Sequence, residues 1–312
     1  MHAIQVIELR KTYPGGVEAV KGIDFDVPGG EVFGLLGPNG AGKSTTVGML
    51  TTTIAPTAGT ARLAGFDVSE QPLAARRISS VVFQEAVVDR GLSGRRNLEL
   101  HGRLWDVEPD VAARRIAELV DALDLAELVD RPVSTYSGGE RRRLEIARAL
   151  VSEPRILFLD EPTVGLDPRV RYELLDVIAG LRASREVTIL LTTHYLDEAE
   201  RLCDRVAIVH SGRIVALDTP AALLDGLGRE LVELRVHGEP ATAIKALREH
   251  RIANADAFAV GSTLTVPLRE RSAAEALAVI DDLALGHVLA TRRPTLDDVY
   301  LRLTGDRLAE AA

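Results

Sequence analysis

Short apolar runs alternate with amphipathic stretches over the first two thirds of the chain. Residues 31–36, 155–159 and 187–192 are almost continuously apolar, which is typical of parallel strands buried on both faces. Between residues 97 and 150, apolar positions recur at helical spacing, most clearly over 110–123. The pattern predicts an α/β fold with a block of helices inserted between two of its strands.

The pattern changes near residues 225–229, and a second set of elements follows. In order, we expect a strand, a helix, two strands joined at Gly261-Ser262, a helix, a strand and a last helix: 230–236, 241–250, the joined pair, 272–283, 287–291 and 296–303. The order βαββαβ is typical of a small α+β domain of ferredoxin-like topology. We therefore predict two domains, residues 1–225 with a helical subdomain at about 85–150, and residues 226–312.

Composition narrows the classes of protein to consider. The 312 residues carry a formal net charge of −9, which disfavours electrostatic binding to nucleic acid or anionic lipid. No stretch approaches the ~20 apolar residues needed to cross a bilayer, and residues 1–10 do not resemble a secretory signal. Because Cys203 is the only cysteine, no intramolecular disulfide can form. We expect a cytoplasmic protein without direct membrane insertion, held at any membrane by a protein partner.

One segment has the pattern of a phosphate-binding loop. Gly37-Pro38-Asn39-Gly40-Ala41-Gly42-Lys43-Ser44 fits G-x-x-x-x-G-K-[ST], between an apolar strand and a plausible helix. The glycines allow backbone N–H groups to surround a phosphate, and the helix N-terminus adds positive partial charge. Lys43 is placed to reach the β- and γ-phosphates, and the Ser44 hydroxyl to ligate Mg²⁺. We expect these residues, with Thr45, to bind the phosphates of a nucleotide.

Two adjacent acids follow the strand at 155–159. Parallel strands deliver their carboxyl ends to the ligand crevice of an α/β sheet, so Asp160 and Glu161 are expected beside the phosphate loop. Asp160 is placed to hold Mg²⁺, directly or through water, and Glu161 to orient or deprotonate an attacking water. The alternative is a solvated strand end, which the nearby phosphate loop disfavours.

A third segment, Ser137-Gly138-Gly139-Glu140, has the pattern of a capping box, which predicts the start of a helix. Its two glycines leave backbone N–H groups open to an anion. From these residues alone, an ordinary capped helix with an exposed basic face at 141–143 explains the segment equally well. About twenty residues before Asp160, however, the segment resembles the signature of ATP-binding-cassette ATPases. That family usually has Gln where Glu140 stands.

Further positions resemble the same family in the same order. They are Tyr13 for the aromatic that stacks on adenine, Gln84 for the glutamine loop, Gly165-Leu166-Asp167 for the loop at the dimer seam, and His194 for the switch histidine. The resemblance implies that Glu161, His194 and Lys43 are catalytic. It also implies that Gln84 joins Ser44 and Asp160 around Mg²⁺.

The resemblance covers about residues 4–224 and implies a head-to-tail homodimer. ATP on one copy's phosphate loop would be covered by Ser137, Gly138 and Gly139 of the other copy. A physical argument supports this arrangement. A phosphate loop contacts one side of a triphosphate, so hydrogen-bond donors for the opposite side must come from elsewhere. Donors supplied in trans can be worth orders of magnitude in rate.

Three segments, 136–144, 193–199 and 294–301, resemble the daunorubicin-resistance type of exporter ATPase. That resemblance implies export of a hydrophobic drug, antibiotic or lipid through a separate permease, with this chain on the inner face of the cell membrane. A more general exporter of lipid or polysaccharide is the next choice. Asp297-Asp298 could form a metal pair, but acids are favoured in the first turn of a helix anyway.

Two other classes of function stay open. One is a soluble ATPase of this type that acts on ribosomes or nucleic acid. Such proteins usually have two cassettes or long coiled-coil insertions, and neither occurs here. The other is a regulatory subunit that binds nucleotide without catalysis, which the presence of Glu161 and His194 disfavours.

Overall fold

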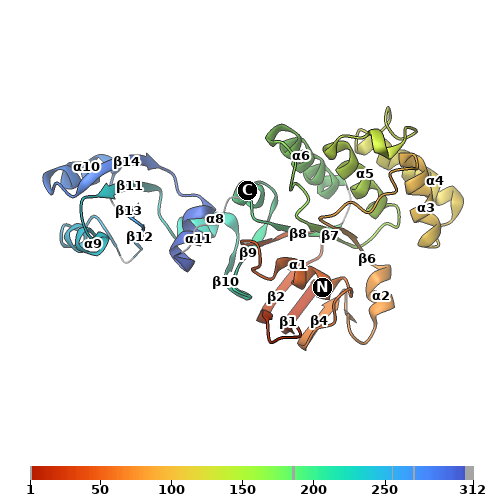
Figure 1. The fold of residues 1–312 in the computed structure, drawn as a ribbon, viewed down its shortest axis with the longest axis horizontal. Coiled ribbons are helices and arrows are strands. Elements are labelled where there is room, and N and C mark those ends of the chain that lie inside the picture. The colour runs from red at the N-terminus through yellow and green to blue at the C-terminus, as the bar shows by residue number, and fades with distance from the viewer. Residues whose placement is uncertain (1, 185–186, 255, 270, 306–312) are drawn as a thin grey trace. The chain divides into compact units, whose positions relative to one another are not determined.

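The computed structural model describes residues 2–184, 187–254, 256–269 and 271–305 (Figure 1). Contacts divide the chain into two compact units, Met1–Ala216 and Leu217–Ala312. The predicted domain boundary lies between residues 225 and 226, just after the short helix α8 (Pro220–Asp225), which the contacts place in the second unit. Within the described ranges, no helix has the length and apolar character needed to span a membrane.

A six-stranded sheet forms the centre of the first unit, in the order β10-β9-β3-β8-β7-β6. Its strands are β3 (Val32–Leu36), β6 (Ser79–Val82), β7 (Ile156–Asp160), β8 (Thr188–Thr193), β9 (Arg205–His210) and β10 (Arg213–Asp218). The parallel strands β3, β7 and β8 are buried at every residue. Burial on both faces explains their continuous apolar sequence, and the three predicted strands are confirmed.

A second sheet, which the sequence pattern did not lead us to predict, lies in the same unit. It contains β1 (His2–Thr12), β2 (Glu18–Pro28), β4 (Ala58–Leu63) and β5 (Phe66–Asp67), in the antiparallel order β2-β1-β4-β5. The alternation of apolar residues such as Ile4 and Val6, which are buried, could have indicated strand β1. Register shifts interrupt the pairing of β1 with both neighbours, which breaks the alternation that predicts a strand.

The helices of the first unit include the one expected after the phosphate loop and those of the block predicted over residues 97–150. They are α1 (Lys43–Leu50), α2 (Pro72–Arg77), α3 (Gly94–Leu104), α4 (Pro109–Ala122), α5 (Gly138–Leu150), α6 (Pro168–Ser184) and α7 (Leu196–Leu202). Helices α3, α4 and α5 pack against one another beside β6 (Figure 1). The predicted capping box is confirmed, since the Ser137 side chain accepts from Glu140 N and the Glu140 side chain accepts from Ser137 N.

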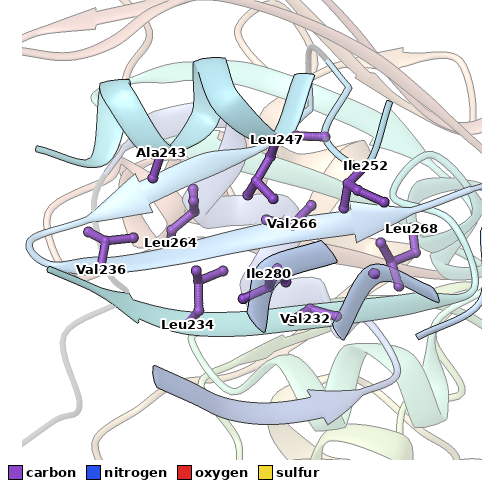
Figure 2. Close-up of a cluster of buried hydrophobic side chains, with 12 residues drawn as sticks. Val232, Leu234, Val236, Ala243, Leu247, Ile252, Leu264, Val266, Leu268 and Ile280 are labelled. Carbon is purple, nitrogen blue, oxygen red and sulfur yellow. The ribbon is translucent and has the colours of Figure 1, made fainter. Parts of the chain in front are cut away.

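The second unit has the predicted βαββαβ order. Its elements are β11 (Glu230–Val236), α9 (Pro240–Glu249), β12 (Phe258–Val260), β13 (Thr263–Leu268), α10 (Ala273–Asp282), β14 (Gly286–Arg292) and α11 (Leu296–Thr304). The strand order β12-β13-β11-β14, with antiparallel neighbours, confirms the ferredoxin-like topology. Figure 2 shows side chains of α9 and α10 meeting those of β11 and β13 in one apolar core.

Asp298 serves the fold of this unit. Its carboxylate accepts from Thr295 N and Thr295 Oγ1, which closes a capping box at the start of α11. Both terminal nitrogens of Arg292 also donate to it, and Arg292 bonds Glu233 as well. The capping interpretation of Asp297-Asp298 is therefore favoured over a metal pair.

The core of the second unit yields a stability prediction. Leu234, fully buried on the central strand β11, packs inside the cluster of Figure 2. Leu234→Ala should lower the free energy of unfolding of this unit by about 2–5 kcal/mol, because it removes apolar contacts and leaves a cavity. Denaturant unfolding followed by circular dichroism measures the change. Val288→Ala, at a side chain that is 41% exposed on β14, is the control and should change little. Equal losses in the two variants would contradict the assigned core.

Candidate nucleotide-binding and catalytic site

The phosphate loop connects β3 to α1, at the carboxyl edge of the central sheet. Two of its glycines are required by close backbone approach. A Cβ on Gly37 would lie 2.3 Å from the Val209 carbonyl oxygen, and one on Gly42 2.5 Å from the Ala19 carbonyl oxygen. Gly42 also has φ +106°, in the left-handed region that L side chains rarely adopt. The loop is thus held in shape by neighbouring backbone, with Gly42 as the N-cap of α1.

Lys43 is the charged centre of the loop. Its side chain is only 4% exposed, and its Nζ donates to the carbonyl oxygens of Gly37 (2.7 Å) and Pro38 (3.1 Å). The same nitrogen lies 3.0 Å from Glu161 Oε1. A buried ammonium needs a counter-charge, so Glu161 fills that role here. A phosphate entering the loop would compete with Glu161 for the lysine.

Asp160, the last residue of β7, lies beside the first turn of α1. Its Oδ1 accepts from Ser44 Oγ (3.2 Å) and from Thr192 Oγ1 (2.6 Å). A hydroxyl and a carboxylate that converge next to a phosphate loop fit Mg²⁺, which proteins usually bind with few of their own ligands plus substrate phosphates. Among the described residues, no group of three or more His, Cys, Asp or Glu is arranged to hold a metal ion.

Glu161 occupies a constrained position immediately after the strand. Its φ of +45° lies in the left-handed region, a strain of the kind that gathers at functional sites. Its Oε2 lies 3.2 Å from His194 Nδ1, and Thr192 Oγ1 accepts from its backbone N–H. Burial by itself raises the pKa of Glu161, but His194 and Lys43 together outweigh burial and hold the pKa below its ordinary value. The group is therefore a carboxylate at neutral pH, able to accept a proton.

His194 follows β8 and is 8% exposed. Its ring packs against Tyr195, with 4.2 Å between ring centroids. Within the described part of the chain, neither ring nitrogen has a hydrogen bond of good geometry, although Nδ1 is close to Glu161. A buried imidazole in that state is ready to bond an incoming polar group.

Arg142 braces the site from helix α5, and the sequence pattern did not reveal it. It is 6% exposed, so the alternative of an exposed basic face is wrong for this residue. Its guanidinium donates to Glu145 and to four backbone carbonyls, those of Phe83, Asp160, Glu161 and Pro162. A usable signal was its spacing to Glu145, three residues on and also buried.

Glu198 is a second brace that the sequence did not indicate. It is fully buried on α7 and accepts from Thr193 Oγ1 (2.7 Å) and from Thr163 Oγ1. Burial raises its pKa, and the two threonine bonds only partly offset that effect. Thr163 lies just past Glu161 and Thr193 just before His194, so Glu198 fixes the spacing of the two loops that carry them.

The remaining predicted residues lie around this centre. Tyr13 follows β1, and its hydroxyl lies 3.3 Å from Thr45 Oγ1 at the start of α1. Gln84 is exposed just beyond β6, the strand that pairs with β7. Ser137 and Gly138 are exposed at the first turn of α5. Across the described ranges, no hydrogen bond or ion pair joins residues 137–139 to the phosphate loop of their own chain.

Comparison with known proteins gives consistent relatives. The ABC transporter family matches residues 20–164. The daunorubicin/doxorubicin resistance ATP-binding protein DrrA of Streptomyces peucetius is 42% identical, over 99% of this chain and 96% of that protein. The Nod factor export ATP-binding protein I of Ralstonia nicotianae is 37% identical, over 98% of this chain and 95% of that protein.

A solved structure agrees for the larger part of the chain. The structure of cbiO1 from Clostridium perfringens, described as part of the ABC transporter complex cbiONQ, is similar with a TM-score of 0.67 and 28% identity. The match covers 72% of this chain and 91% of that one. The similarity of sequence thus extends over almost the whole chain, and the similarity of fold over most of it.

The brace at Arg142 gives a prediction about stability. Arg142→Met keeps the length of the side chain but leaves Glu145 buried without its cation, so the free energy of unfolding should fall by about 3–5 kcal/mol. Arg169→Met is the matched control, because the Arg169 side chain is 88% exposed and its pairing with Glu173 is screened by water. Urea unfolding of the three proteins measures the difference. Similar values for both variants would show that the buried guanidinium does not hold the site together.

Proposed function

This chain belongs to the ABC transporter family of ATP-binding proteins, and we propose that it hydrolyses ATP as one of two identical subunits that drive an exporter. The supporting observation is the convergence of Lys43, Glu161 and His194 within one buried cluster at the carboxyl edge of the central sheet. Asp160 and Ser44 lie beside that cluster. The arrangement suits binding of a triphosphate next to a base that can act on water.

Nucleotide binding begins at the phosphate loop. Backbone N–H groups of residues 37–44 surround the phosphates, and Lys43 exchanges Glu161 for the β- and γ-phosphates. Tyr13, near Thr45, stacks on the adenine. Ser44, Asp160 and Gln84 would hold Mg²⁺, which would neutralise charge on the phosphates.

Release of Glu161 from Lys43 prepares the hydrolytic step. The free carboxylate orients water for attack on the γ-phosphate and accepts the proton that the water loses. The bond between the γ-phosphorus and the β–γ bridging oxygen breaks, and ADP leaves. His194 donates a hydrogen bond to the γ-phosphate from a ring nitrogen that has no aligned partner among the described residues. Because Glu198 ties both loops together, these two side chains stay in register during the reaction.

The site is completed by a second copy of the chain. Ser137 and Gly138 present an exposed helix N-terminus, and no described interaction links residues 137–139 to their own phosphate loop. A helix N-terminus is a good anion site, so these groups cover the nucleotide of the partner in a head-to-tail dimer. The loop 165–167 lies at the seam, and Gly139, in the same turn as Gly138 but buried against Val170, supports that turn from behind. After hydrolysis the charge of the γ-phosphate no longer holds the two copies together, and the dimer opens.

Transport requires a membrane permease, to which the chain binds from the cytoplasmic face. A hollow of about 270 Å³ is lined by Phe83, the residue before Gln84, and by other residues in or just after α1, α2, α3, α5 and β6. It contains the apolar side chains Val81, Phe83 and Val87. We place a permease helix here, so that closure of the dimer moves it and shifts the population of transport states.

The transported class follows from the relatives. Proteins named for daunorubicin and doxorubicin resistance are 40–42% identical to this chain, and those named for Nod factor export are 37–38% identical. A hydrophobic drug or antibiotic is therefore the first proposal for the substrate, and a lipid-like molecule the second. Affinity capture from solubilised cells should recover integral-membrane permeases, whereas recovery of ribosomes would support the rival class.

Catalysis is tested most simply at Glu161. Glu161→Gln keeps the shape but removes the base, so ATP hydrolysis should fall at least about 100-fold. Binding of ATP should persist or strengthen, because Lys43 no longer has an anionic competitor. Phosphate release and equilibrium binding of a fluorescent ATP analogue measure the two quantities. Glu153→Gln, an exposed acid beyond α5, is the control. Undiminished hydrolysis by Glu161→Gln would contradict the assigned base.

A further inference from the structure

We propose that Tyr195 and Arg171 are positioning residues for His194. The Tyr195 ring holds the imidazole in the orientation that the γ-phosphate requires, and the Arg171 guanidinium holds the ring. This inference rests on the proposed function, because it concerns the side chain that donates to the γ-phosphate. Neither residue is among those that the sequence predicted for the site.

Packing, more than hydrogen bonding, fixes the His194 ring. Glu161 Oε2 lies 3.2 Å from Nδ1, but within the described ranges neither ring nitrogen has a hydrogen bond of good geometry. The χ2 torsion of a histidine has broad minima, so such a ring turns unless its neighbours prevent it. The Tyr195 ring lies against it, with 4.2 Å between the centroids and 38° between the ring planes. Because an N–H donor must point at its acceptor, the orientation that Tyr195 imposes decides whether the imidazole can donate.

The backbone of Tyr195 is fixed beside the site, but its side chain needs a further support. The Tyr195 N–H donates to Thr193 Oγ1 (2.9 Å), and that hydroxyl donates to Glu198 (2.7 Å). The side chain is only half-buried, and its hydroxyl makes no hydrogen bond to any described residue. The ring is therefore held through its faces and not through its hydroxyl.

Arg171, early in helix α6, supplies that support. Its guanidinium carbon lies 4.5 Å from the centroid of the Tyr195 ring, in the geometry of a cation–π contact. Arg171 Nη2 lies 3.2 Å from Asp197 Oδ2, and the Tyr172 hydroxyl donates to the same oxygen (2.9 Å). Asp197 follows Tyr195 by two residues, so one short segment provides both the ring and the carboxylate that hold the guanidinium.

A buried polar atom of Arg171 supports the same assignment. Its Nε is buried and has no hydrogen-bond partner in the described part of the chain, although the side chain as a whole is 17% exposed. Native proteins rarely leave such an atom without compensation. The face of the Tyr195 ring compensates it, because a guanidinium is weakly hydrated and is attracted to the π electrons of an aromatic face.

The first experiment measures the kinetics of ATP hydrolysis by the full chain. Tyr195→Ala should lower kcat roughly tenfold to 100-fold and change KM for ATP by less than about twofold, because it loosens a donor used in the transition state. Tyr195→Phe, which keeps the ring, should restore most of the lost rate. A Tyr195→Phe variant as impaired as Tyr195→Ala would overturn the role of the ring. If Tyr195→Ala does not bind ATP, Tyr195→Leu, which fills the space without a flat ring, takes its place.

The contribution of the guanidinium is measured in the same assay. Arg171→Met should lower kcat by about threefold to tenfold, the effect expected from losing one cation–π contact. Arg169→Met is the matched control, because Arg169 lies on the same helix with its side chain 88% exposed. Equal rates in the two variants would show that Arg171 does not hold the ring.

Dependence on His194 separates positioning from a structural role. In single-turnover assays, adding Tyr195→Ala to His194→Ala should cause no further loss, because the imidazole that Tyr195 positions is already gone. A further loss as large as that in the wild-type background would overturn this inference. Undiminished hydrolysis by His194→Ala alone would instead contradict the proposed function.

A measurement independent of hydrolysis reports on the imidazole directly. Diethyl pyrocarbonate modifies accessible imidazoles, and His194 is 8% exposed. Its modification, followed by mass spectrometry, should be severalfold faster in Tyr195→Ala than in the wild type or in Tyr195→Phe. The exposed His250 is the internal reference. Equal rates at His194 in the three proteins would contradict a ring that holds the imidazole in place.

Discussion

The buried ion pair between Lys43 and Glu161 is the interaction on which the rest of the site depends. Both side chains are no more than 6% exposed, so neither charge is stable there without the other or a replacement. In the proposed function, a triphosphate would provide that replacement for the lysine and leave the carboxylate beside His194. In the proposed mechanism, binding of substrate and preparation of the base are therefore one event, at the carboxyl ends of the neighbouring parallel strands β3, β8 and β7.

A continuous set of hydrogen bonds links this ion pair to the hollow proposed for the permease helix. Val87, which lines the hollow, donates its N–H to Glu145. Glu145 pairs with Arg142, and Arg142 donates to the carbonyls of Asp160 and Glu161. The helix that carries these side chains begins at the exposed turn of Ser137. Movement of α5 against the central sheet would thus shift side chains at the proposed nucleotide site, the proposed dimer interface and the hollow together. Such a network is a physical route for coupling, to be tested by double-mutant cycles.

Sequence alone predicted the parts of this arrangement that depend on local pattern. The buried strands, the capping box at Ser137 and the βαββαβ unit follow from periodicity and capping chemistry. The antiparallel sheet of β1 and β2 was missed because bulges interrupt its alternation. Arg142 and Glu198 were missed because their partners are distant backbone carbonyls and threonines, which only the folded chain brings near. The roles of all the predicted site residues, from Lys43 and Glu161 to Tyr13, Gln84 and residues 137–139, stay predictions, since they concern a nucleotide, a metal ion and a second copy of the chain.

The most direct test is ATP hydrolysis by mixtures of two inactive variants. Lys43→Ala disables a phosphate loop, whereas Gly138→Asp suits a helix first turn but places a carboxylate against the partner's phosphates. Each variant alone should be inactive. An equal mixture should recover roughly a quarter of the wild-type rate, because mixed dimers contain one intact composite site. A mixture no more active than the two variants measured separately would contradict a site shared between two copies of the chain.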